Sequence, residues 1–119
     1  MSIKNEVVNK IVKVLDSKKA TDIKVLYVGE VTTLTDYFVL ATANSVPQAQ
    51  ALYDHIEEEL QKDGIKPQIR EGYNTAEWIL VGFDDIVVHI FLKDAREFYG
   101  LEHIWKDAID QDISDLLID

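Results

Sequence analysis

The chain has 119 residues, no cysteine and a formal net charge of −10, with 22 Asp and Glu against 12 Lys and Arg. This length suits one domain that folds without a covalent crosslink, and the missing cysteine excludes thiol catalysis, disulfides and cysteine-ligated metal centres. No segment approaches the ~18 apolar residues that a membrane helix needs, and the first residues lack the apolar core of a secretory signal. We therefore expect a soluble, cytoplasmic protein.

The charge is unevenly distributed along the chain. Residues 1–24 contain six lysines and three acidic residues, whereas residues 25–119 contain six basic and nineteen acidic residues. A field of this sign repels phosphate backbones, so we expect no direct binding to DNA. It attracts a basic protein partner, although an acidic surface also serves solubility on its own.

The first half of the chain predicts a helix, a pair of strands and a second helix. Apolar residues recur at helical spacing over residues 3–17, with lysine on the other side. Residues 23–30 and 37–43 are rich in β-branched and aromatic side chains and favour a hairpin. Ser45 begins a capping-box pattern, which predicts the N-cap of a helix that ends at Gly64.

The second half predicts three strands and a helical arm. Residues 67–71 favour an edge strand, because proline cannot donate to a β-ladder. Two apolar segments, 77–81 and 86–92, predict a strand pair joined at the turn Asp84-Asp85. The acidic and aromatic segment 96–105 follows as a short helical arm.

These elements define the expected architecture. Their order predicts an α/β domain in two layers, with a mixed five-stranded sheet and helices mainly on one face. We assign residues 1–108 to this single domain. Residues 109–119 are rich in aspartate and predict an acidic C-terminal tail.

Asp84, Asp85 and His89 form the most promising set for catalysis. On an extended strand, however, Asp85 and His89 are about 13 Å apart at roughly 3.3 Å per residue, which is too far to share a metal ion. A turn at the two aspartates and a histidine hydrogen-bonded on one face of the sheet explain the same residues.

Other signs of catalysis are weaker. His55 with Glu59, and His103 with Asp107, lie one helical turn apart, but neither pair has a third metal ligand at a matching spacing. The sequence contains no nucleophile elbow and no phosphate-binding glycine loop. We therefore predict that the chain is not an enzyme and uses no cofactor or metal.

Trp78 is the strongest candidate for a partner-binding residue. Alternation along its strand places Trp78 and Leu80 on one face of the sheet, and Ile79 and Val81 on the other. If helices cover only one layer, the tryptophan–leucine patch stays open and marks a partner site; a tryptophan in a strand also suits the core.

The arm REFYGLEHIW divides into two sides. Helical spacing predicts a buried stripe of apolar residues, Phe98, Leu101 and Trp105. The residues left exposed are Arg96, Glu97, Tyr99 and Glu102. This second set suits either the rim of an interface or an ordinary solvated surface.

Three segments together resemble one known family. They are TDYFVLATA (residues 35–43), EWILVGFDDIVVHIFL (residues 77–92) and REFYGLEHIW (residues 96–105). In this order and spacing they are similar to the ribosomal silencing factor family, also called Iojap-like, over about residues 5–108. The chain departs from the family pattern at Asp84, where glycine is frequent, and at Gly100, where a polar residue is usual.

The resemblance implies a function. Members of this family are expected to repress translation by binding the large ribosomal subunit through its ribosomal protein fourteen, which blocks joining of the small subunit. The resemblance also implies a fold similar to nucleotidyltransferases without their catalytic motif, and a possible homodimer.

Combined with the residue patterns, the resemblance predicts a set of partner contacts. Trp78 and Leu80 form the apolar centre of the interface. Asp85 and Glu97 pair with lysine or arginine of the partner, and Arg96 and Tyr99 shape the rim.

Two alternatives remain open from the sequence. One is a metal-dependent nucleotidyl- or phosphotransferase that uses Asp84, Asp85 and His89. The other is a general homodimeric adaptor without a ribosomal role.

Overall fold

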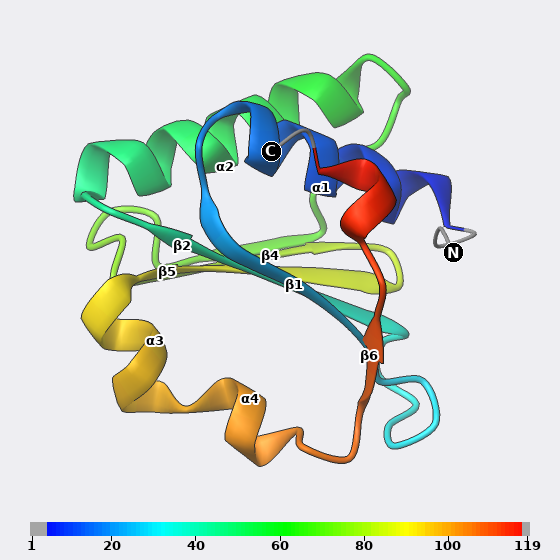
Figure 1. Ribbon diagram of the computed structural model, residues 1–119. Helices are drawn as coiled ribbons and strands as arrows, with labels where there is room; N and C mark the ends of the chain where they lie inside the picture. Colours follow the sequence, from blue (N-terminus) through cyan, green and yellow to red (C-terminus); the bar gives the residue numbers. More distant parts are fainter. Residues whose placement is uncertain (1–4, 118–119) are drawn as a thin grey trace.

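The computed structural model describes residues 5–117 as one mixed sheet with helices on both of its faces (Figure 1). The six strands follow the order β3-β4-β5-β2-β1-β6 across the sheet. Their bounds are β1 Thr21–Tyr27, β2 Tyr37–Ala43, β3 Ile69–Glu71, β4 Trp78–Phe83, β5 Ile86–Leu92 and β6 Ile109–Gln111. The helices are α1 Glu6–Ser17, α2 Val46–Gln61, α3 Lys93–Tyr99 and α4 Leu101–Ile104, and a 3-10 turn, η1, spans Ser114–Leu116.

The two central strands, β2 and β5, run parallel in one register, which starts at Tyr37 opposite Ile86. The other pairings in the sheet are antiparallel. Because β2 and β5 are covered on both faces, their sequences are almost continuously apolar. Their shared direction brings the ends of both strands, from which α2 and α3 start, to the same edge of the sheet.

One face of the sheet packs against α1 and α2. The Asn5 side chain caps α1, and the Ser45 hydroxyl caps α2 by accepting a hydrogen bond from the Gln48 backbone N–H at 3.2 Å. The helix start predicted at Ser45 is therefore confirmed. Residues 3 and 4, which were expected to belong to the first helix, lie outside the described residues. Within residues 5–117, no helix is long and apolar enough to cross a membrane.

The opposite face carries an arm made of α3 and α4 (Figure 1). A smaller core lies between the arm and the sheet, built from Leu26, Val28, Phe38, Leu40, Phe91, Ala95 and Leu101. The expectation of two layers with helices mainly on one face is therefore wrong. β2 and β5 carry apolar residues on both faces, and both faces need a cover.

The C-terminal segment also differs from its prediction. Ile109–Gln111, expected in a tail, form β6 and pair antiparallel with β1, so the sheet has six strands where five were expected. Ile113 and Leu116 are then buried against the helical layer. Removing these apolar side chains from water is favourable enough to order an acidic segment. The domain boundary at residue 108 and the likeness to nucleotidyltransferases stay predictions.

Candidate functional site

Trp78 lies on the face of the sheet that carries the arm, as the alternation along β4 predicted. Its indole Nε1 donates a hydrogen bond to Nδ1 of His89 at 3.0 Å. Its rings pack beside Phe91 of β5 and Tyr99 of α3, with ring centroids 5.0 and 4.9 Å away. The indole is therefore held by three neighbours while the residue stays half-buried.

Leu80 is the next residue of β4 on this face, and it is also half-buried. The ladder places it opposite His89 of β5 and Glu71 of the edge strand β3. Ile79 and Val81 point the other way and are fully buried under the helices. The predicted division of β4 into two faces is confirmed.

The arm continues the aromatic residues out to solvent. Phe98 is 83% exposed, Ile104 69% and Tyr99 40%. The rings of Phe98 and Tyr99 meet edge to face with centroids 5.2 Å apart, and Tyr99 in turn contacts Trp78. Exposed apolar residues close together on a folded domain are candidates for a protein-binding surface. We call Trp78, Leu80, Phe98, Tyr99 and Ile104 the docking face.

Sequence reasoning missed two residues of the docking face. Phe98 was expected in the buried stripe of a continuous arm helix, which is wrong because Gly100 ends α3 with a φ of 57°. Leu101 restarts the helix as α4 and is buried, with Trp105 half-buried. Gly100, within FYGLE, was the sequence signal that could have predicted the break between α3 and α4. Ile104 carried no comparable signal.

Arg96 was predicted at the rim of the interface and to be exposed, but its side chain is only 12% exposed. Its guanidinium donates to the Glu102 carboxylate at 2.9 Å, to the Thr42 hydroxyl at 2.8 Å and to the carbonyl of Asp22. The bond from Arg96 lowers the pKa of Glu102, and Lys24, 3.0 Å from the same carboxylate, adds to this effect. Arg96 therefore fastens the arm to β1 and β2.

The two predicted acidic contacts lie far apart. Glu97 is exposed on α3, beside the docking face. Asp85 precedes β5, whereas α3 follows it, so the length of the strand, roughly 23 Å, separates Asp85 from the start of α3. The structure therefore places Asp85 at the opposite end of β5 from Arg96, Glu97 and Tyr99.

Asp85 has a clear role within the fold. Its carbonyl oxygen accepts hydrogen bonds from the Thr35 hydroxyl at 2.7 Å and from the backbone N–H groups of Asp36 and Tyr37 at 2.9 and 3.1 Å. Burial raises the pKa of its carboxyl group, and a hydrogen bond with the Asp36 side chain raises it further. Asp85 thus joins the β4–β5 turn to the segment that leads into β2.

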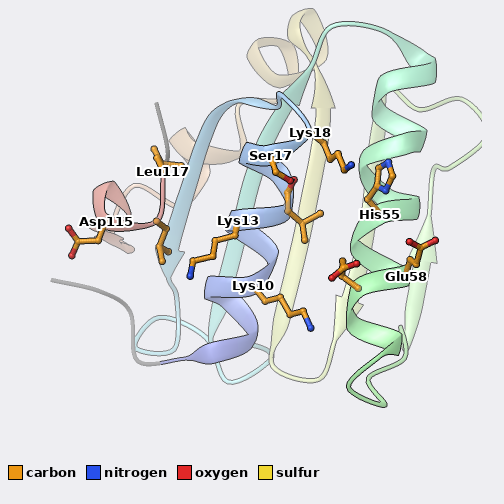
Figure 2. A pocket seen from close by; sticks show the side chains of 11 residues that line it. Lys10, Lys13, Ser17, Lys18, His55, Glu58, Asp115 and Leu117 are labelled. Atoms are coloured by element: carbon orange, nitrogen blue, oxygen red, sulfur yellow. The ribbon is translucent and has the colours of Figure 1, made fainter.

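A hollow lies on the opposite, helical face, between α1, α2 and η1 (Figure 2). It has a volume of about 690 Å³, and its lining includes Lys10 and Lys13 of α1 and Glu58 and Glu59 of α2. Part of this charge is already paired, since Lys10 lies 2.6 Å from Asp63 and Lys62 lies 2.7 Å from Glu59. His55 and Glu59, one of the pairs weighed as metal ligands, both line it. Among residues 5–117, no group of three or more His, Asp or Glu is placed to hold a metal.

The catalytic alternative required Asp84, Asp85 and His89 to act together. His89 is instead buried on the arm side of the sheet, where it is engaged by Trp78. Burial lowers the pKa of its imidazole to about 3, so the ring is neutral at physiological pH. The sequence offered a second explanation, a histidine hydrogen-bonded on one face of the sheet. The structure shows His89 in that position.

Fold and site together define a class: a small α/β domain whose arm and sheet carry exposed and half-buried apolar residues on one side. Comparison with known proteins then identifies the family. The family described as "Ribosomal silencing factor during starvation" matches residues 2–118. The chain belongs to this ribosomal silencing factor family, and it is a non-catalytic protein, as its sequence predicted.

Individual relatives agree with this assignment. "Ribosomal silencing factor RsfS" of Bacillus subtilis is 40% identical over 93 residues, which cover 78% of this chain and 79% of the relative. "Protein Iojap, chloroplastic" of Arabidopsis thaliana is 37% identical over 98 residues, covering 82% of this chain and 40% of that protein. A crystal structure of a protein from Bacillus halodurans superposes with a TM-score of 0.80 at 33% identity, covering 90% of this chain and 97% of the other.

Proposed function

We propose that this protein represses translation in the cytoplasm by binding the large ribosomal subunit through ribosomal protein fourteen and blocking the small subunit. Its family and the names of its relatives support a ribosomal target. The single observation that carries the docking mode is the series of ring contacts that leads from the half-buried Trp78 through Tyr99 to the exposed Phe98.

The docking face supplies the apolar centre of the contact. Trp78 and Leu80 sit on a strand of the sheet, and Phe98 and Ile104 sit on an arm fixed to that sheet by Arg96. Apolar anchors on rigid elements lose little conformational freedom on binding, so most of their buried area contributes to affinity. Arg96 therefore acts on the partner through the arm, with its own guanidinium directed inward.

Charge gives the contact its speed and orientation. Ribosomal proteins are basic as a class, and this chain carries a net charge of −10. Glu97, exposed beside Phe98, pairs with a lysine or arginine of the partner and fixes the register of the docked arm. Asp85 lies at the other end of β5 from α3, so it joins the contact only where the partner extends along the length of that strand.

Blocking follows from size alone. The domain measures 34 × 33 × 31 Å along its principal axes. A domain about 31 Å thick that docks where the two subunits meet keeps their surfaces too far apart to touch. No chemical step is needed. The possible homodimer stays a prediction, since the docking face serves equally well for a second copy.

Sucrose-gradient co-sedimentation tests this function. The wild-type protein should migrate with isolated large subunits, and not with small subunits or preformed couples, and should reduce reassociation. Because charge steers the encounter, binding should weaken at higher salt. Trp78→Ala should weaken binding by about 2 kcal/mol, roughly 30-fold.

Leu34→Ala is the matched control, since Leu34 is 90% exposed but lies in the loop between β1 and β2, away from the docking face. It should bind like the wild type. Equal binding to all particles, or a folded Trp78→Ala variant with unchanged affinity, would count against the proposal.

A further inference from the structure

His89 is out of place in the core. It sits in the middle of β5 between Val88 and Ile90 and is only 3% exposed. Its Nε2 is buried and has no hydrogen-bond partner among residues 5–117. A buried polar group without a partner lowers stability, whereas leucine of similar volume carries no such penalty. A residue that breaks this rule within an otherwise consistent strand points to function.

The surroundings of His89 fix its ring. The Phe38 ring meets it edge to face with centroids 4.8 Å apart, and the Phe91 ring lies nearly parallel to it at 6.2 Å. Nδ1 accepts the hydrogen bond from Trp78 Nε1 at 3.0 Å. Since Nδ1 accepts in a neutral imidazole, the proton resides on Nε2. Burial keeps the pKa of the ring at about 3, so Nδ1 remains an acceptor at physiological pH.

His89 also lies between the two residues of β4 that belong to the docking face. It is directly opposite Leu80 in the β4–β5 ladder, and Trp78 is its diagonal neighbour, opposite Phe91. Directly opposed and diagonal side chains on one face of an antiparallel pair are within contact range. The imidazole of His89, on the neighbouring strand β5, is therefore within contact range of both Trp78 and Leu80.

An indole has a single polar group, the Nε1 donor, so one acceptor decides its orientation. Without Nδ1, the donor of Trp78 would turn to water, and the ring would leave its place beside Phe91 and Tyr99. We infer that His89 is a positioning residue: it holds the Trp78 indole in the orientation that docks, at the expense of the stability of the core. The inference rests on the proposed docking function.

The test compares two substitutions of His89 with a control. His89→Leu removes the acceptor but keeps the volume and relieves the unpartnered Nε2. It should leave the melting temperature unchanged or raise it, and weaken binding to the large subunit about tenfold, the factor that loss of one ordered anchor contact gives. His89→Asn restores an acceptor near the Nδ1 position and should recover part of the binding at lower stability. Ile90→Val, on the opposite face of β5, should lower the melting temperature and bind normally.

A spectroscopic measurement checks the hydrogen bond without the ribosome. In ¹⁵N-labelled wild-type protein, a scalar coupling should connect Trp78 Nε1 with His89 Nδ1, and the coupling should vanish in His89→Leu. A wild-type spectrum without this coupling overturns the inference. The inference is also overturned if His89→Leu binds the large subunit like the wild type while Trp78→Ala binds it weakly. If Trp78→Ala itself binds normally while the coupling is present, the proposed docking contact fails, and the role of His89 in docking fails with it.

Discussion

Arg96 and Glu102 form an ion pair of 2.9 Å that ties the end of α3 to α4, and Arg96 reaches past Glu102 to Thr42 of β2. The pair makes the arm and the sheet one unit. Arg96→Ala should therefore lower the free energy of unfolding by about 2 kcal/mol, as expected for loss of partly buried hydrogen bonds to a charged group. Urea denaturation measures this loss. Glu97→Ala, one residue away and exposed, should change it by less than about 0.5 kcal/mol.

The same pair gives the stability a pH dependence. Arg96 lowers the pKa of Glu102 in the folded state, so the folded state binds its proton less readily than the unfolded chain does. The stabilisation is complete above the ordinary glutamate pKa of about 4.3 and is lost as the pH falls through the lower folded value. The stability difference between wild type and Arg96→Ala should therefore shrink on acidification below about pH 4. A difference that stays constant from pH 7 to pH 3 would contradict this assignment.

Phe98 and Phe91 should respond oppositely to truncation. Phe91 is fully buried, so Phe91→Ala should cost about 3–5 kcal/mol of unfolding free energy. Phe98 is 83% exposed, so Phe98→Ala should leave the stability within about 0.5 kcal/mol of the wild type. It should nevertheless weaken binding to the large subunit by at least about 1 kcal/mol. Chemical denaturation and co-sedimentation of each variant separate the two effects. Unchanged binding of Phe98→Ala would remove the arm from the docking face.

Local signals in the sequence were sufficient for much of the fold. Ser45 was recognised as an N-cap because the hydroxyl and the N–H that it binds are three residues apart. The two faces of β4 followed from alternation, since side chains of a strand point to opposite sides in turn. β5 was found from its continuous apolar run. Each of these features depends on neighbours within one element.

What failed depends on contacts between distant segments. β6 exists because Ile109 pairs with Tyr27, and no pattern within an aspartate-rich segment indicates that partner. Arg96 was placed outside because helical spacing is silent about Thr42, which lies 54 residues earlier and accepts its bond. Only part of the docking face was predicted, because the rest depends on contacts between distant segments. Trp78 and Leu80 follow from β4 alone, whereas the exposure of Phe98 requires the bend at Gly100.

Asp84 occupies a backbone position that glycine fits better. Its φ is 57°, in the left-handed region. Asp84→Gly should therefore stabilise the protein by about 1 kcal/mol, because glycine reaches this conformation without strain. Asp84→Ala is the control: it keeps a Cβ at a positive φ, where alanine is less tolerated than aspartate, so it should not stabilise the protein. Thermal melting of both variants tests this prediction. Equal shifts of the melting temperature would rule out backbone strain as the cause.

Gly72 and Gly100 both have positive φ, of 80° and 57°, but their surroundings differ. A Cβ at Gly72 would lie 2.1 Å from the carbonyl oxygen of Trp78, whereas a Cβ at Gly100 would find only the Glu97 carbonyl oxygen, at 4.0 Å. Gly100→Ala should therefore cost only the conformational penalty, about 1–2 kcal/mol. Gly72→Ala must in addition displace the backbone at Trp78.

Gly72→Ala should accordingly be the more destabilised variant in urea, and it should also shift the indole Nε1–H resonance of Trp78. Gly100→Ala should leave that resonance in place, because Gly100 lies in the arm and has no backbone contact with β4 as close as that of Gly72. If both variants lose the same stability and neither moves the resonance, the close approach of Gly72 to β4 does not help to hold Trp78. If only Gly72→Ala shifts the Trp78 resonance, the loop before β4 helps to hold Trp78 in place. It then acts together with His89, which bonds the indole, and Arg96, which fastens the arm to the sheet.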